Sequence, residues 1–560
     1  MAVHGIDLGT TNSAIARTGP DGRPQVLAGL SGEPTTPSVV LFASPGEHVV
    51  GEGARREARL DPEHVCTLVK RRMGDAEWRF VAHGKAWSAP AVSALVLRSL
   101  VADAAFASGD EPTAAVITVP AYFGDEERRA TMLAGTYAGL DVLDVLSEPI
   151  AAALAYGFGR LDGSPELAKG ATHETVLVYD LGGGTFDATV IELADRRISV
   201  LAVEGDHQLG GADWDERVAV ALSRRFCADN PDAEDPLDDS AGAQALVLAA
   251  ERAKQQLSDA ERTDVVVAHD GARSTITLSR AELEEMTAPL LRRTVDLTRA
   301  CLDEAARRGV GCVDRVLLVG GSSRMPAVAE ALRRELDLDP RLHDPDLAVA
   351  RGAALYGEKK ELERMVVADL RTRGRLRDGV PLEDAASTDV DDACRRVADA
   401  FRVPLAQVRR AVDVQVDTVV SRGFGVLAVN SAAGRLEPSW LVHRNDRLPI
   451  RTSRSYGTMR ADQTEIEVTV VEQQGQAESS RPEDAKVLIV GQISGIPPGH
   501  DEGSEVRVTF EMGFDGVLHV TAFHVEAGIP LTLIATTGAT LSQAEVARER
   551  DQLGKTRRRE

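Results

Sequence analysis

The sequence has few cysteines and no excess of positive charge, and each shortage excludes a class of protein. Lysine and arginine total 64 against 87 acidic residues, a net charge of −23. Nucleic acid and anionic membranes are therefore not expected partners, because phosphate groups reward clustered cations. The one basic cluster, residues 557–559, is expected to be a solvated tail. No CxxC pair or regular spacing joins the cysteines, which excludes a disulfide framework and a cysteine metal site: Cys66, Cys227, Cys301, Cys312 and Cys394.

Long apolar runs and an apolar leader with a charged start are also missing from the sequence. We expect no stretch of membrane-spanning length, and the chain enters a strand almost at once after Val3. These features predict a cytoplasmic protein with reduced cysteines. With 560 residues, of which 43% are hydrophobic, the chain is long enough for two to four compact units.

Residues 1–357 alternate buried-strand runs with longer helical segments, which predicts an α/β domain with helices covering sheets. The runs and segments that define the pattern are 91–107, 116–120, 176–179, 281–305 and 316–319.

The rest of the chain has a different character. Residues 358–411 are charged and helical, and we expect an extended last helix followed by a connector. Residues 412–540 alternate apolar and polar positions, as in 465–470 and 505–510, which predicts a separate β-sandwich domain. Residues 541–560 are expected to form a short truncated helix and the basic tail.

Two segments far apart in the chain end a hydrophobic strand in nearly the same way: residues 5–11 (GIDLGTT) and 178–185 (VYDLGGGT). Each offers a carboxylate, then glycines whose backbone N–H groups can approach an anion closely, then a hydroxyl. One such turn is weak evidence, whereas two copies predict a pair of related lobes that grip one polyphosphate and its cation. The phosphate-binding residues expected in these turns are Gly9, Thr10, Thr11, Asn12, Gly182, Gly183, Gly184 and Thr185.

Three aspartates in and beside the two turns are candidate metal ligands. Asp7, Asp180 and Asp187 are expected to surround a hard divalent cation, most naturally Mg²⁺ with several retained waters.

A third glycine-rich turn follows the strand run 316–319. Its candidate nucleotide-binding residues are Gly320, Gly321, Ser322 and Arg324, and the Arg324 guanidinium is placed to stack on a purine face. A plain strand-to-helix turn with a surface arginine explains the same residues.

Glu251, Lys254 and Ser258 share one face of a helix, because they are spaced three and four residues apart. They are candidates for hydrogen bonds to ribose hydroxyls and a purine edge, and a solvated helix face is the alternative.

Taken together, the motifs resemble the DnaK-type, seventy-kilodalton heat-shock chaperone family, of which this chain looks like a lidless, divergent member. The matching motifs occur in the family's order at residues 5–15, 116–127, 147–157, 179–187, 209–215 and 318–326. The resemblance implies an actin-like ATPase of two duplicated lobes followed by a peptide-binding β-domain. The cofactors that it implies are ATP or ADP and Mg²⁺, with K⁺ as a further candidate.

The resemblance also implies roles for single residues of the ATPase. Lys70 matches the lysine that orients the attacking water, and Glu148 matches an acidic residue of the catalytic centre. Thr185 matches the hydroxyl near the γ-phosphate, and Asp346 matches a nucleotide-site aspartate. Asp180 and Asp187 complete the expected catalytic set. Phosphoryl transfer to water depends mainly on positioning and electrostatics, which such residues supply.

Residues 426–540 resemble the family's substrate domain more weakly than the front of the chain resembles the ATPase. We expect six side chains near an apolar peptide groove: Val426, Val429, Tyr456, Met459, Ile466 and Val468. Ordinary sandwich core is the alternative for each of them.

Three departures from the family pattern affect partners. The connector 412–417 is diluted by polar residues, so its docking should bury less apolar surface and weaken interdomain coupling. The helical lid is essentially missing, so bound peptide should leave faster. Asp144, Ser147 and Gly124 replace residues of the surface for J-domain co-chaperones, so an ordinary J-domain partner is not expected.

The sequence leaves three candidate functions for this protein. The first is an ATP-hydrolysing chaperone whose β-domain binds unfolded or extended polypeptide, with a nucleotide-exchange factor as a candidate partner. The second is a nucleotide-gated scaffold or regulatory protein that binds one dedicated partner with little turnover. The third is a small-molecule kinase, in which a C-terminal β-domain has no evident task.

Overall fold

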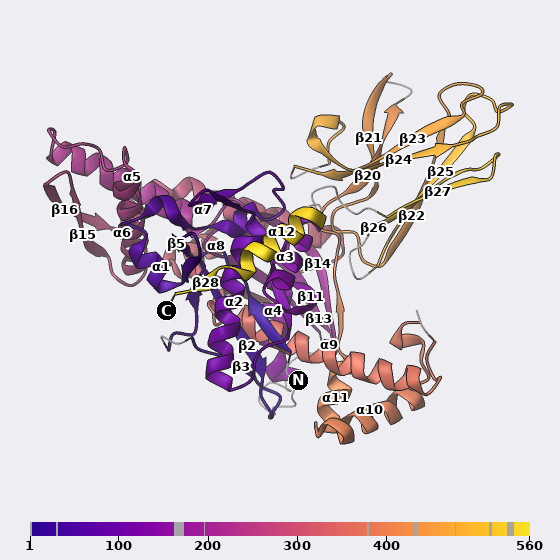
Figure 1. The fold of residues 1–560 in the computed structure, drawn as a ribbon, viewed down its shortest axis with the longest axis horizontal. Helices are drawn as coiled ribbons and strands as arrows, with labels where there is room; N and C mark the ends of the chain where they lie inside the picture. Colours follow the sequence, from indigo (N-terminus) through magenta and orange to yellow (C-terminus); the bar gives the residue numbers. More distant parts are fainter. Residues whose placement is uncertain are drawn as a thin grey trace.

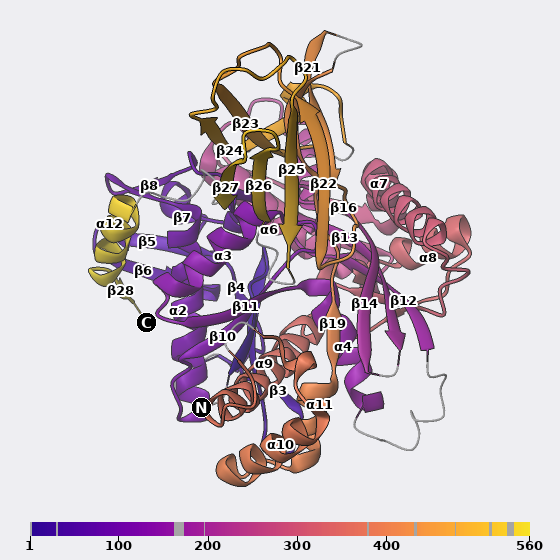
Figure 2. The ribbon, with the colours of Figure 1, turned by 90° about the vertical axis from the view of Figure 1, so that its right-hand side faces the viewer.

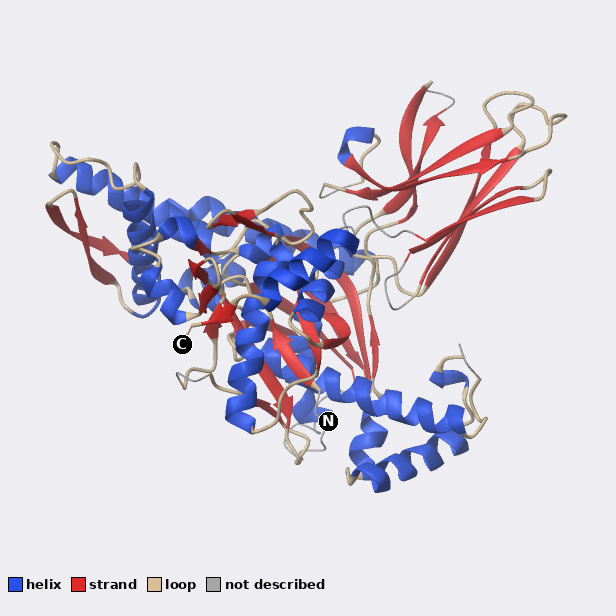
Figure 3. Ribbon diagram, viewed as in Figure 1, coloured by secondary structure: helices blue, strands red, loops and turns tan. Residues whose placement is uncertain are grey.

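The computed structural model describes residues 3–29, 32–161, 173–194, 196–377, 380–430, 434–475, 478–513, 518–534 and 543–559. An α/β body carries two appendages (Figure 1), a helical unit around α10 (Ser387–Phe401) and α11 (Leu405–Asp413) and a β-domain. Colouring by secondary structure separates the mixed body from the strands of the β-domain (Figure 3).

The first lobe of the body is built on a six-stranded sheet. Its strands are β1 (His4–Asp7), β2 (Asn12–Thr18), β3 (Pro24–Val26), β4 (Thr36–Pro37), β10 (Ala114–Val119) and β11 (Asp141–Ser147). The order is β11–β10–β1–β2–β3, with β4 paired to β2. β11, β10 and β1 run parallel to one another, whereas β2 is antiparallel to both of its neighbours, β1 and β3.

The second lobe repeats the order of five of these strands. Its strands are β12 (His173–Leu181), β13 (Phe186–Ala194), β14 (Arg197–Asp206), β17 (Arg315–Val319), β18 (Pro340–Leu342) and β19 (Gln415–Asp417). The order β18–β17–β12–β13–β14 has the same parallel and antiparallel pairs as the first sheet. The two predicted glycine turns join β1 to β2 and β12 to β13, at equivalent places.

Smaller elements extend each lobe. The first lobe adds β5 (Val40–Ser44), β6 (Glu47–Val50), β7 (Val65–Cys66), β8 (Phe80–Ala82), β9 (Lys85–Trp87), α1 (Glu52–Glu57), α2 (Ala89–Ser108) and α3 (Asp125–Tyr137). The second adds α5 (Gly211–Asp229), α6 (Ser240–Asp259), β15 (Arg262–His269), β16 (Ala272–Ser279), α7 (Arg280–Arg307) and α8 (Pro326–Leu336). These elements confirm the α/β class predicted for the front of the chain.

The helix α2 corrects one expectation from the sequence. It is long and apolar enough to cross a membrane by length and composition alone, although no such run was expected. Most of its side chains, including Leu95 and Leu97, are buried in the core of the first lobe. In this fold it is a core helix.

Two helices join the lobes. α4 (Glu148–Leu161) packs on β12 and β13 of the second sheet, and α9 (Ala348–Thr372) packs on β1 and β2 of the first. The two helices touch each other so closely at Gly352 that a Cβ there would lie 1.7 Å from the Ala151 carbonyl oxygen.

The segment expected to be a connector is a folded helical unit. α9 ends at Thr372, the chain turns at Gly374 with φ 67°, and α10 and α11 pack back on α9. Their shared core contains Leu362, Val366, Leu370, Cys394, Val397 and Val408. Amphipathic helices of this kind bury an apolar face and cannot remain an open linker in water.

The polar connector that follows is docked as a strand. β19 pairs with β14 in parallel and becomes the edge of the second sheet. The polar side chains of this connector are paired, because Arg197 contacts Asp417 at 3.1 Å and Arg196 contacts Asp413. Weakened interdomain coupling stays a prediction.

The β-domain has two four-stranded antiparallel sheets that share one core. The first contains β20 (Phe424–Asn430), β21 (Arg435–Val442), β23 (Glu465–Gln473) and β24 (Ala485–Ser494). The second contains β22 (Ile450–Gly457), β25 (Glu505–Met512), β26 (Leu518–His524) and β27 (Ile529–Ile534). Side chains from both sheets meet in this core, as in a sandwich.

The residues predicted to lie near a peptide groove differ in burial, and the groove itself stays a prediction. Val426 and Val468 are only 4% and 5% exposed and belong to the sandwich core, which was the alternative for each of them. Tyr456 and Ile466 are partly buried against that core. Val429 and Met459 are 42% and 67% exposed.

The C-terminal residues are not a solvated tail. α12 (Gln543–Gly554) and β28 (Arg557–Arg558) pack on the first lobe, and β28 pairs with β6. The basic cluster is therefore part of a sheet, because backbone groups of β6 are available at its open edge.

The contact between α4 and α9 predicts a strong effect of one methyl group. Gly352→Ala should destabilise the protein by about 1–3 kcal/mol, because backbone atoms of Ala151 cannot move away cheaply. Thermal unfolding followed by circular dichroism measures the change. Gly311→Ala is the matched control, since no heavy atom lies within 4 Å of its Cβ position. Equal melting temperatures for the two variants would contradict the packing described.

Candidate nucleotide site and interdomain contact

A cleft of about 630 Å³ lies between the two lobes and is lined by side chains from both. The structure brings together in it nearly all of the residues predicted from the sequence. Those that line the cleft are Asp7, Gly9, Thr10, Thr11, Asn12, Lys70, Glu148, Asp180, Gly182, Gly183, Thr185, Glu251, Lys254, Ser258, Gly320, Gly321, Ser322, Arg324 and Asp346. Gly184 and Asp187 are not among the lining residues.

The two glycine turns interlock across the cleft. A Cβ on Gly183 would lie 2.2 Å from the Thr11 hydroxyl oxygen, and one on Gly184 would lie 2.3 Å from the Thr10 methyl carbon. Glycine is needed at both positions because any side chain would push the lobes apart. Gly184 thus acts at the contact between the turns.

Buried acidic residues surround the floor of the cleft. Burial raises the pKa of Asp7 to about 7 and the pKa of Asp187 to about 8, and in each case Glu148 adds repulsion. Burial, followed by repulsion from Glu148, Asp187 and Asp7, raises the pKa of Asp180 well above its usual value. Lys70 lowers all three pKa values and donates a hydrogen bond to Glu148.

This charge balance fits a divalent cation. Four carboxylates face a single ammonium group, so a bound cation would relieve their mutual repulsion. In the described part of the chain, no three His, Cys, Asp or Glu side chains converge as a ready set of direct ligands. Mg²⁺ usually keeps several waters, through which Asp7, Asp180 and Asp187 would hold it.

The helix face predicted to contact a nucleoside is engaged in ion pairs. Lys254 donates to the Gly211 carbonyl oxygen at 2.8 Å and pairs with Asp215 at 2.8 Å, and Ser258 donates to the Lys254 carbonyl oxygen. Glu251 pairs with Arg55 of α1, which joins the lobes across the cleft.

Charged side chains complete other parts of the cleft. Arg324 and Asp346, both predicted nucleotide contacts, pair with each other. Arg71 donates to the Gly184 carbonyl oxygen at 2.9 Å and pairs with Asp213 at 2.6 Å, so it bridges the lobes. Arg71 follows Lys70 directly but carries no motif in the sequence that marks it as a site residue; only the fold brings it to Gly184.

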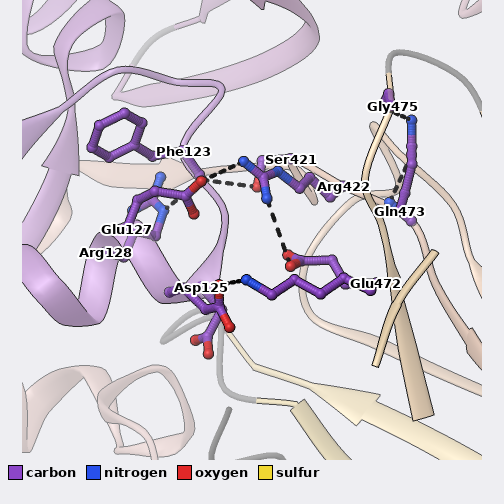
Figure 4. A network of polar contacts seen from close by, with 12 residues as sticks. Phe123, Asp125, Glu127, Arg128, Ser421, Arg422, Glu472, Gln473 and Gly475 are labelled. Carbon is purple, nitrogen blue, oxygen red and sulfur yellow. Dashed lines mark hydrogen bonds and ion pairs between the residues drawn. The ribbon is translucent and has the colours of Figure 1, made fainter. Parts of the chain in front are cut away.

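A second group of charges joins the first lobe to the β-domain (Figure 4). Arg422 pairs with Glu127 of α3 at 2.6 Å and lies 3.6 Å from Glu472 of β23. Ser421 donates to the Phe123 carbonyl oxygen at 3.1 Å. A side chain at Gly124 would meet this network, since its Cβ would stand 2.8 Å from a Glu472 oxygen.

Tyr122 connects this interface to the cleft. Its backbone N–H donates to the Asp187 carboxylate at 3.1 Å. Its ring lies against the guanidinium groups of Arg422 and Arg444, at 5.6 and 5.2 Å from the ring centroid. Arg444 also pairs with Glu204 of β14 at 2.9 Å, so the β-domain contacts both lobes.

The fold and cleft define a class of protein with two related lobes around an acidic, glycine-lined cleft and a β-domain docked beside it. A family model described as Hsp70 protein matches residues 3–83, 75–372 and 420–560, so the chain belongs to the Hsp70 family. Members of this family bind ATP or ADP with Mg²⁺, are typically ATPases, and bind unfolded polypeptides and co-chaperones. Membership therefore supports a general chaperone and ATP-binding role.

The interdomain network predicts a pH dependence of docking. Glu472 is fully buried, and burial raises its pKa to about 8, although Arg422 lowers it. An acid whose pKa is raised in the docked state takes up a proton on docking. Docking of the β-domain on the first lobe should therefore be weakest above pH 8. It should strengthen as the pH falls toward about 4.5, the ordinary pKa of a glutamate side chain.

Small-angle scattering between pH 6 and 8.5 measures this effect as a radius of gyration that increases as the pH rises. Glu472→Gln should flatten most of the pH response, because the amide does not titrate; Glu126, whose pKa burial also raises, supplies the rest. An unchanged pH response in Glu472→Gln would show that another group controls docking.

Proposed function

We propose that this Hsp70-family chain is an ATP-hydrolysing chaperone of the DnaK type, in which the bound nucleotide controls how the β-domain holds extended polypeptide. The observation that carries the proposal is the short route from Asp187 through Tyr122 to Arg422. A change at the Asp187 carboxylate is transmitted to the contact with the β-domain through the backbone N–H and the ring of Tyr122.

The residues of the cleft have distinct tasks in this proposal. Lys70, held by Glu148, keeps a positive charge at the cleft floor, where negative charge develops during attack by water. The Thr185 hydroxyl and the amide of Gly183 are donors for phosphate oxygens, whereas the Gly182 amide donates to the Thr185 carbonyl oxygen at 3.0 Å. Bound Mg²⁺ would neutralise part of the negative charge on the phosphate groups.

The nucleotide-gated scaffold remains the second candidate. Burial of Val426 and Val468 favours it, because these side chains leave less apolar surface for a peptide in the docked arrangement. The acidic set around Lys70 favours turnover instead. Family membership gives the kinase hypothesis no support.

Removal of the Lys70 ammonium group tests turnover. Lys70→Ala should lower the rate of phosphate release from ATP by about 10²–10³-fold, because one preorganised charge donor is lost. Phosphate release is measured at saturating ATP, and nucleotide affinity is measured separately. Lys85→Ala, in the hairpin of β8 and β9, is the control. A wild-type rate no greater than that of Lys70→Ala would favour the scaffold.

Binding of extended peptides tests the role of the β-domain. A labelled apolar peptide should bind the full chain with different affinity in ATP and in ADP, because in this proposal the nucleotide changes the docking of the β-domain through Arg422. Fluorescence anisotropy gives both affinities. Arg422→Ala should reduce the difference, while Arg451→Ala, on an exposed part of β22, should retain it. No peptide binding in either nucleotide would favour a dedicated partner.

A further inference from the structure

The C-terminal segment, residues 543–559, is built into the first lobe. α12 lies beside α2, and β28 extends the sheet of β5, β6 and β7 (Figure 2). The Arg557 amide donates to the Gly46 carbonyl oxygen at 2.9 Å, and the Arg559 amide donates to that of His48 at 2.8 Å. This pairing closes the open edge of β6.

The helix of this segment completes an apolar core. Leu553 is 0% exposed and belongs to the same cluster as Leu95 and Leu97 of α2. Val546 packs against that cluster. Full removal of an apolar side chain from water is a favourable contribution that no solvated tail makes.

Polar contacts fix the helix at the start of α2. Ser88, the N-cap residue of α2, donates to the Glu549 carboxylate through its amide at 3.2 Å and its hydroxyl at 2.8 Å. Arg98 donates to the Leu553 carbonyl oxygen at 2.7 Å, which satisfies an orphan acceptor at the end of α12.

The strand is fixed by one arginine of the basic cluster. Arg558 pairs with the buried Asp103 of α2 at 2.8 Å. The neighbouring Arg557 side chain is exposed. The two arginines therefore differ in what they contact while carrying the same charge.

We propose that residues 543–559 are a permanent anchor that keeps the β-domain tied to the first lobe in every nucleotide state. The β-domain then has two attachments, because its N-terminal connector forms β19 on the second lobe. Only residues 535–542 join β27 to α12, and eight residues span at most about 30 Å. The end of β27 therefore stays within that distance of α12 even when the network around Arg422 and Glu472 opens.

Hydrogen exchange tests whether the anchor is permanent. In the full chain without nucleotide, with ADP and with ATP, peptides covering residues 545–559 should exchange at least about 100-fold more slowly than an unstructured chain. Protection in the three states should agree within about twofold. Exchange at the unstructured rate in any state would overturn the proposal. Attachment of the segment does not depend on the proposed function, because protection in the nucleotide-free chain measures it; its persistence with ADP and ATP rests on the proposed nucleotide binding.

The two neighbouring arginines give a matched pair of variants. Arg558→Ala should speed exchange of residues 555–559 by about tenfold or more, because the contact with Asp103 is lost. Arg557→Ala, with the same change of charge, should alter it by less than about twofold. Equal effects would show that the tail is held by nonspecific charge and not by the contacts described.

Small-angle scattering tests the tether. Arg422→Glu, which opens the interdomain network, should increase the maximum dimension only slightly while the anchor is intact. Addition of the pair Glu549→Gln and Arg558→Ala should increase it further, whereas addition of Arg557→Ala should not. Leu553 is kept in these variants so that the core of the first lobe stays filled. Full extension in Arg422→Glu alone would overturn the tether.

Discussion

The close approach of the two glycine turns is the constraint on which the rest of the structure depends. Gly183 and Gly184 lie where any Cβ would collide with Thr11 and Thr10 of the other lobe. Because these turns end equivalent strands of two sheets with the same order, their contact sets the distance between the lobes. That distance in turn fixes the cleft and the helices α4 and α9 that cross beneath it.

The cleft concentrates negative charge that the fold itself leaves unbalanced. Asp180 and Asp187 are buried and Asp7 is partly buried near Glu148, and Lys70 is the ammonium group that opposes them. A folded protein tolerates such an arrangement when a ligand completes it, which is why perturbed acids gather at functional sites. The same backbone that contacts Asp187, at Tyr122, also meets the arginines of the β-domain. Electrostatics of the cleft and docking of the β-domain are thus physically linked.

The sequence predicted local features well and distant contacts poorly. The strand runs 116–120, 176–179 and 316–319 lie at β10, β12 and β17, because buried strands show in the sequence as continuous apolar residues. The residues predicted for the nucleotide site, except Gly184 and Asp187, line one cleft, although their roles stay predictions. By contrast, the sequence left open whether Val426 and Val468 line a groove or the core, because an alternating strand pattern does not say which face is covered; the structure buries both in the core.

By itself, the sequence determined the alternation of strands and helices, the duplicated acidic and glycine turns, and the all-β character of residues 412–540. These are local properties, set by periodicity and by residues that only certain turns accept. Only the tertiary structure decided that residues 387–413 fold onto α9, that the polar connector becomes β19, and that Arg558 reaches Asp103. Each of these contacts joins segments far apart in the chain, and their energy comes from burial and pairing that exist only once both partners are in place.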